Sequence, residues 1–199
     1  MMEAQRDYTG SKIGMWLFLL SEILLFGGLF ILYSTYRYKN PIEFHLAAWE
    51  LNRVIGTLNT LILITSSLTM VLSIYSLQKG NRKWSTSFLM ATIFFGFLFL
   101  TVKYGEWAAK IGHGIYPNSP RLLGRSKGEI LFYGLYYSMT GLHGLHVLVG
   151  IFVLSAMLFL MMRGKINENR SIPLENSGLY WHLVDIIWIF LFPLFYLIT

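Results

Sequence analysis

The sequence predicts an all-α membrane protein, a polytopic bundle with five membrane-spanning helices. Hydrophobic residues make up 55% of the 199 positions, charged residues only 13%, and the mean hydropathy is +0.54. Soluble domains carry about 25% charged residues, and a chain of this length has too little interior to hide so much apolar surface from water. This composition excludes a soluble enzyme, a disordered tail and a nucleic-acid binder, although the net charge is +6.

Five apolar segments are long enough to cross a bilayer, whose hydrocarbon core of roughly 30 Å needs about 20 residues of helix. The alternating ten-residue segments typical of membrane barrels do not occur. The loops between the apolar segments are short, so the whole chain (1–199) is expected to form one membrane domain. The predicted spans are residues 13–36, 54–77, 88–107, 131–162 and 179–198.

Basic residues decide the orientation of such a bundle, because cytoplasmic loops carry an excess of Lys and Arg. The N-terminal side holds Arg6, Lys12, Lys79, Arg82, Lys83, Arg163, Lys165 and Arg170, and the opposite side holds Arg37, Lys39, Arg53, Lys110, Arg121, Arg125 and Lys127. The two compact basic loops, 79–83 and 163–170, favour a cytoplasmic N-terminus and an outer C-terminus. The polar first twelve residues predict no signal peptide.

The chain contains no cysteine. This excludes disulfides, thiol catalysis, and zinc or iron–sulfur sites with cysteine ligands.

Glu22 lies about nine residues into the first span, about 14 Å deep at 1.5 Å per residue. A charge at that depth costs at least a few kcal/mol, so the carboxyl needs a partner or a proton. His143 and His146 are three residues apart near the middle of the fourth span and share a helix face. We expect Glu22, His143 and His146 to form a buried polar cluster between helices. A proton-active role for Glu22 is the open alternative.

Haem or metal ligation is the competing interpretation of the histidines. Two histidines that ligate one haem must lie at the same depth in the membrane. Measured from the same membrane surface, His182 lies about 6 Å deep and His146 about 24 Å deep. A third metal ligand beyond Glu22 is not evident. We therefore expect no catalytic, cofactor-binding or metal-binding residue in this chain.

Two further pairs of ionisable residues lie inside the spans. Lys103 and Glu106 are spaced i, i+3 at the end of the third span, which predicts an ion pair. His182 and Asp185 have the same spacing in the fifth span, next to Trp181, a residue typical of the headgroup region. A local hydrogen bond that buries Asp185 is the simpler interpretation, and a proton antenna or a contact with a lipid or another subunit is the alternative.

Taken in chain order, these segments resemble subunit III of the haem–copper oxidases, the cytochrome c oxidase family. GMWLFLLSEILLF is similar to the family's Glu-bearing helix, and LNTLILITSS with the turn GNRK is similar to the next helix and loop. Glu106, followed by Trp107, matches a family Glu that precedes an aromatic residue. SMTGLHGLHVLVG and YWHLVDIIWIFLF match its last two helices, with Leu142 in place of an aromatic residue.

The resemblance implies an accessory subunit without a redox centre of its own. Haems and copper belong to subunits I and II in the family, and subunit III packs on subunit I, supports its proton uptake and stability, and holds structural phospholipid. The expected setting is the bacterial cytoplasmic membrane, in aerobic respiration with proton translocation and reduction of O2 to water. The expected partners are subunit I above all, subunit II, other subunits of the complex and phospholipids, with no nucleic acid.

The chain also departs from the longer family members. Those have seven helices, and this sequence is expected to begin at the third, so one wall of their lipid cleft is missing or comes from another chain. The loop 108–129 is longer than is usual at that point. The five-helix form also occurs in quinol oxidases and beside nitric oxide reductases, which stay open as alternatives. A stand-alone membrane cytochrome and an ion transporter are weaker ones.

Overall fold

The computed structural model describes residues 2–168 and 170–197, with side chains from Thr9 onward. The elements in chain order are α1 (Met2–Lys39), α2 (Pro41–Trp49), α3 (Arg53–Gln78), α4 (Arg82–Gly112), α5 (Pro120–Leu123), α6 (Lys127–Met162), α7 (Ile172–Phe192) and the π-helical turn η1 (Pro193–Leu197). Residue 198, the last of the fifth predicted span, lies outside the described part.

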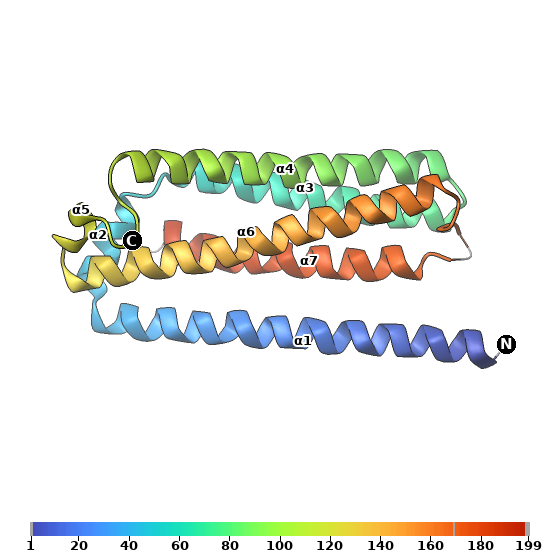
Figure 1. Ribbon diagram of the computed structural model, residues 1–199, viewed down its shortest axis with the longest axis horizontal. Helices are drawn as coiled ribbons and strands as arrows, with labels where there is room; N and C mark the ends of the chain where they lie inside the picture. Colours follow the sequence, from blue (N-terminus) through green and yellow to red (C-terminus); the bar gives the residue numbers. More distant parts are fainter. Residues whose placement is uncertain (1, 169, 198–199) are drawn as a thin grey trace.

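Five long helices run side by side and dictate the shape of the molecule (Figure 1). Within the described residues, these five are long and apolar enough to cross a membrane, which confirms the predicted fold class. α3, α4, α6 and α7 pack on one another as a four-helix bundle, and α1 lies along α6 and α7 on its outside. Only 11% of the most apolar window of α1 is buried in the protein, against 56% for α7.

The helices extend beyond the predicted spans because polar caps continue them past the apolar residues. Asn52 caps α3 with a side-chain oxygen that accepts hydrogen bonds from the amides of Val54 and Ile55. Ser126 and Glu129 form a reciprocal capping box at the start of α6. Each device satisfies amide groups that a helix start leaves free, so the helix begins before the first apolar residue.

Two short helices, α2 and α5, were not predicted. Both lie at the end of the bundle where α1 ends, which we call the cap side; the opposite end, where α1 begins, is the N-terminal side (Figure 1). Each has a proline in its first turn, Pro41 in α2 and Pro120 in α5. Proline is favoured there because its missing N–H is not needed, so this local signal was present in the sequence.

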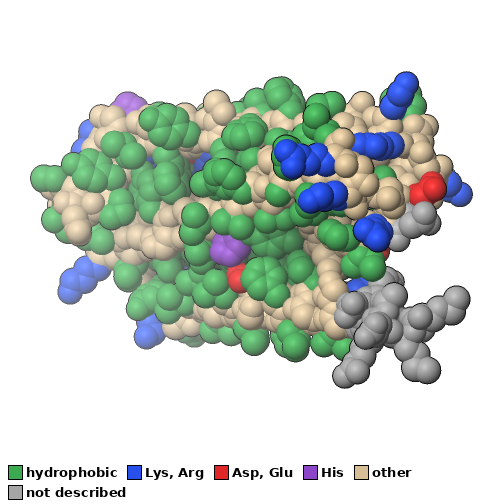
Figure 2. Space-filling model, turned by 45° about the vertical axis from the view of Figure 1, so that its right-hand side comes forward, with side chains coloured by type: hydrophobic (Ala, Val, Ile, Leu, Met, Phe, Trp, Pro, Cys, Tyr) green, Lys and Arg blue, Asp and Glu red, His purple; other side chains and the backbone are tan. Residues whose placement is uncertain are grey.

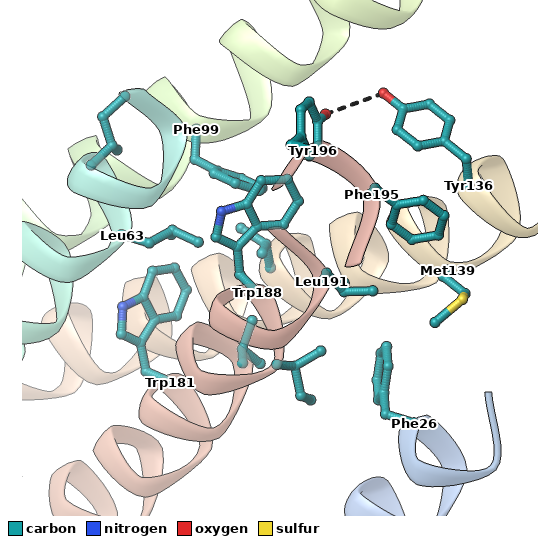
Figure 3. Packing of buried hydrophobic residues seen from close by; sticks show 14 of the residues in the cluster. Phe26, Leu63, Phe99, Tyr136, Met139, Trp181, Trp188, Leu191, Phe195 and Tyr196 are labelled. Atoms are coloured by element: carbon teal, nitrogen blue, oxygen red, sulfur yellow. Dashed lines mark hydrogen bonds between the residues drawn. The ribbon is translucent and has the colours of Figure 1, made fainter. Parts of the chain in front are cut away.

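Trp181 of α7 holds the bundle together at its centre (Figure 3). Its side chain is fully buried and its indole N–H donates to the hydroxyl of Ser66 on α3 at 2.8 Å. Gly96 on α4 and Gly150 on α6 border the indole so closely that an added Cβ would lie 2.8 Å and 2.7 Å from its ring atoms. The residue type had suggested that Trp181 faces the headgroup region. In the structure it packs in the core instead.

The π-helical turn after α7 brings two aromatic side chains into the core. Phe195 and Tyr196 are 0% and 1% exposed, and both point towards α6 in Figure 3. The hydroxyl of Tyr33 on α1 donates to the carbonyl of Leu194. This bond attaches the turn to α1 and positions Tyr196 beside the polar groups described below.

We predict that Gly150→Ala destabilises the purified protein, because the new methyl group clashes with the rigid, buried indole of Trp181. Overpacking of this kind costs about 1–3 kcal/mol, and the thermal midpoint in detergent should fall by several degrees. Gly134→Ala on the same helix is the matched control, since nothing lies within 4 Å of its added Cβ. Equal midpoints for the two variants would contradict the packing described here.

Candidate functional site

A pair of ionisable side chains joins α1 to the bundle. The Glu22 carboxylate and the His146 ring meet at 2.9 Å between Oε2 and Nε2, and their side chains are 14% and 15% exposed. Figure 2 shows a histidine and an acidic side chain in contact within a largely apolar surface. The pair links α1 to α6 directly through their side chains.

The hydrogen bonds of His146 determine how this pair carries its proton. Nδ1 lies 2.8 Å from the carbonyl oxygen of Leu142, and a carbonyl only accepts, so Nδ1 bears a hydrogen. Nε2 then faces Glu22 either as an acceptor from a protonated carboxyl or as the donor of an imidazolium to a carboxylate. In both forms one proton lies between the two groups and the pair is neutral, which suits a bilayer interior.

His143 does not join the Glu22–His146 pair, so the expected three-residue cluster divides. Residues three apart on a helix differ by about 60° around its axis, and His143 points into the bundle instead of towards α1. Its ring is fully buried between Phe99 and Trp188, with ring centroids 5.5 Å and 5.2 Å away. Neither ring nitrogen has a hydrogen-bond partner within the described chain.

Lys103 and Glu106 form a buried ion pair, as their spacing suggested, and two tyrosines complete it. The Lys103 ammonium donates to Glu106 Oε2 at 2.9 Å, to the Tyr136 hydroxyl at 3.0 Å and to the Tyr196 hydroxyl at 2.6 Å. Tyr196 in turn donates to Glu106 at 2.7 Å. The three ammonium hydrogens thus have three acceptors, and Lys103, at 5% exposure, stays inside the bundle instead of extending to the surface.

His182 and Asp185 do not form the expected local hydrogen bond. His182 Nδ1 pairs instead with the Ser67 hydroxyl on α3 at 2.7 Å. Asp185 is 3% exposed, and neither of its carboxylate oxygens has a hydrogen-bond partner among the described residues. The predicted local hydrogen bond between His182 and Asp185 is therefore wrong. The His182 imidazole contacts α3 instead, and the Asp185 carboxyl has no partner on its own helix.

A further polar group, missed in the sequence, lies on the cap side. Glu50, at the end of α2, accepts hydrogen bonds from Arg125 at 2.8 Å and from the Tyr133 hydroxyl at 2.6 Å. Burial alone raises the pKa of Glu50, but these two hydrogen bonds and the positive charges of Arg125 and Lys110 outweigh it, so the pKa lies below the ordinary value of 4.5. No spacing in the sequence relates Glu50 to residues 75 or more positions away.

Within the described residues, no three His, Asp or Glu side chains lie close enough together to hold a metal ion. The fold and these polar groups define the class: a polytopic helical membrane protein with two ion pairs, Glu22–His146 and Lys103–Glu106, inside its spans.

Comparison with known proteins gives the family. Residues 4–199 match the family model described as cytochrome c oxidase subunit III. The chain is 33% identical over 192 residues to "Cytochrome c oxidase subunit 3" of Thermostichus vulcanus, covering 94% of this chain and 87% of the relative. It is 27% identical over 197 residues to "Probable quinol oxidase subunit 3" of Staphylococcus saprophyticus, covering 98% and 92%. The chain belongs to the cytochrome c oxidase subunit III family of haem–copper oxidases, which confirms the resemblance.

A fused relative adds information on the assembly. The chain is 32% identical over 193 residues to "Heme-copper oxidase subunit I+III" of Aeropyrum pernix, covering 94% of this chain but spanning only 22% of that longer protein. In that relative a subunit III sequence and a subunit I sequence form one polypeptide.

We predict that Glu22→Leu lowers the free energy of unfolding by about 1–2 kcal/mol, because it leaves His146 Nε2 unpaired between helices. Glu22→Gln should cost less than about 0.5 kcal/mol, since an amide N–H can still donate to Nε2. A double-mutant cycle with His146→Leu, read by thermal unfolding in detergent, isolates the interaction. Strict additivity of the two leucine substitutions would show that the pair contributes nothing; Ser21→Ala on α1 serves as the control.

We predict a pH-dependent contribution from Glu50. Because its pKa is depressed in the folded protein, the stabilisation is present above pH 4.5 and is lost as the pH falls through the folded pKa. Glu50→Gln should be less stable than the parent protein by about 0.5 kcal/mol at pH 7, a small value because the pair is partly solvent-screened. The difference should shrink below pH 4.5; a difference that grows on acidification is the opposite outcome.

Proposed function

We propose that this chain is an accessory subunit, without a redox centre of its own, of a proton-pumping terminal oxidase that reduces O2 to water. It packs on subunit I and supports the proton uptake and stability of that subunit. The observation that carries this proposal is the match of nearly the whole chain to subunit III. The second subunit, other chains of the complex and phospholipids are its further proposed contacts.

The surroundings of the histidines support a role without haem or metal. Both nitrogens of His146 are already hydrogen-bonded, to Leu142 and Glu22. His143 is closed in by two aromatic rings. A haem iron needs a free imidazole nitrogen with open space beside it, and neither side chain provides both.

The polar pairs are proposed to hold the subunit in one shape. Glu22 with His146 joins α1 to α6, and Lys103 with Glu106 joins α4 to the turn after α7 through Tyr196. Because polar bonds in a bilayer have no water to compete with them, such links favour one helix arrangement over others. A subunit of fixed shape can in turn restrain the helices of subunit I.

A groove on the N-terminal side supports the proposed phospholipid. It has a volume of about 400 Å³ and is lined by Lys12 and Trp16 of α1, Gln78 of α3 and Glu175 of α7, among others. A cation, a carboxylate and a tryptophan beside apolar residues suit the headgroup region of a membrane.

The proposed orientation places the N-terminal side in the cytoplasm. On the cap side Lys110 is buried and donates to the Glu50 carbonyl, and Arg125 is paired with the Glu50 carboxylate. Neither is a free loop charge of the kind that retains a loop in the cytoplasm. By the same test Lys12, paired with Glu175, and Arg82, bonded to the carbonyls of Met161 and Met162, drop out on the N-terminal side. Six basic residues against five leave a small excess there, which supports the proposed orientation only slightly.

The quinol oxidase named above favours a second candidate, the same accessory role in an enzyme that oxidises quinol. That relative is matched over 92% of its length, so chain length and helix number suit both enzymes. The electron donor is chosen by other subunits in either case.

We predict that the tagged chain, purified in mild detergent from its native membrane, brings subunit I with it and shows a haem signal in the reduced-minus-oxidised spectrum. Removal of the partner subunits should leave a 23.0 kDa chain with no haem absorbance. A haem signal that stays with the isolated chain would contradict the proposal. The haem type and the presence of a cytochrome c-binding subunit would separate the two enzyme types.

A further inference from the structure

The short helix α2, on the cap side, is apolar on two opposite faces (Figure 1). The inner face packs on α6 and on the turn after α7, and it consists of Phe44, Ala47 and Ala48. The outer face consists of Ile42, Leu46 and Trp49, which are 71%, 54% and 66% exposed. At about 100° per residue, the three outer side chains point directly away from the inner face. Large apolar side chains gathered on an exposed face mark a contact surface.

Two ring contacts give the depth of α2 in the membrane. The apolar segment 13–36 of α1 is about 36 Å long, so the cap-side edge of a hydrocarbon core of about 30 Å falls within its last two turns. The Phe44 ring lies 5.5 Å from the ring of Tyr33, in this part of α1. It lies 5.4 Å from the ring of Phe132, near the start of α6. α2 therefore lies at the boundary between hydrocarbon and headgroups.

The residue types around the outer face are those that favour this boundary. The guanidinium carbon of Arg53 lies 4.9 Å from the centre of the Trp49 ring. Tyr38, at the end of α1, is 88% exposed. Tryptophan and tyrosine concentrate at the headgroup level of membranes, where the charge of a long basic side chain stays in contact with water and lipid headgroups. An Arg stacked on a Trp thus suits the lipid interface on both counts.

The surface next to α2 is also apolar and belongs to a membrane span. Val54, Leu58 and Leu61 of α3 are 76%, 48% and 57% exposed. Arg53, the first residue of α3, joins this row to Trp49. A stable protein interface buries roughly 800 Å² on each partner, more than the three side chains on the outer face of α2 can offer. Lipid needs no such minimum area, since it covers any apolar surface at this depth.

We propose that α2 is an interfacial helix, and that Ile42, Leu46 and Trp49 insert into the boundary between headgroups and acyl chains of the cap-side leaflet. The partner is the lipid surface itself and not a single bound lipid, so this contact differs from the groove on the N-terminal side. Glu50, which ends α2, accepts a hydrogen bond from Tyr133 of α6. The helix is thus attached to the bundle and holds its cap side at a fixed depth. The inference goes beyond the proposed function and needs only the membrane class.

Spin labelling tests the depth, because the chain has no cysteine and each single-cysteine variant is labelled at one site. Leu46→Cys probes the outer face of α2. Leu24→Cys, 68% exposed in the middle of α1, is the hydrocarbon control, and Pro117→Cys, exposed in the loop after α4, is the water control. The labelled full chain is placed in nanodiscs of phosphatidylcholine and phosphatidylglycerol. Collisions of the label with O2 and with a water-soluble nickel chelate then give its depth.

The label at position 46 should lie about 5–10 Å below the phosphates, shallower than the label at position 24. It should collide with the nickel chelate less often than the label at position 117. Nickel collisions as frequent as at position 117, a depth equal to that of position 24, or shielding from both reagents overturns the inference.

Photo-crosslinking tests the same contact in the assembled complex. The photoreactive residue p-benzoylphenylalanine in place of Leu46 should give adducts with phospholipid, identified by mass spectrometry. In place of Pro117 it should give none. A crosslink from position 46 to another protein chain, or no more lipid adduct than from position 117, overturns the inference.

Discussion

The structure depends on one constraint: a polar side chain in hydrocarbon costs free energy unless it has a hydrogen-bond partner, and the two ion pairs find theirs within the protein. Lys103 meets this constraint most completely, with a carboxylate and two phenol oxygens around its ammonium. Glu22 and His146 meet it by holding one proton between them. Glu106 lies on the same helix as Lys103, but Tyr136 and Tyr196 come from α6 and η1, and Glu22 meets His146 between α1 and α6. These cross-helix bonds therefore also determine which helices touch.

Close packing supplies the rest of the stability. Lipid is as apolar as the side chains it surrounds, so helices in a membrane associate through fit instead of through exclusion of water. Trp181 illustrates this, because its indole occupies space left by Gly96 on α4 and Gly150 on α6. The aromatic residues around Trp188 and Phe195 extend the same packing towards the cap side (Figure 3). The polar bonds therefore lie within a rigid surrounding that keeps their geometry.

Two kinds of contact in the candidate site could be predicted from the sequence: contacts between residues one helical turn apart, and contacts between residues at the same depth in the membrane. Lys103 and Glu106 are one helical turn apart, so their meeting needs no knowledge of other helices. Glu22 and His146 are far apart in the chain but lie at similar depth, which made their contact a reasonable expectation. The contact of Tyr196 with Lys103 could not be predicted from the sequence. It depends on the π-helical turn Pro193–Leu197, and the hydrophobic pattern of the sequence does not indicate such a turn.

The sequence by itself determined the membrane class, the five spans and the family, because apolar length and short motifs are properties of local segments. Only the tertiary structure decided that His146 faces α1 while His143 faces the interior, and that His182 turns to Ser67 and leaves Asp185 unpaired. The physical reason is the rotation of each helix about its own axis. This rotation decides which neighbouring helix a side chain contacts, and the spacing of residues along the sequence does not determine it.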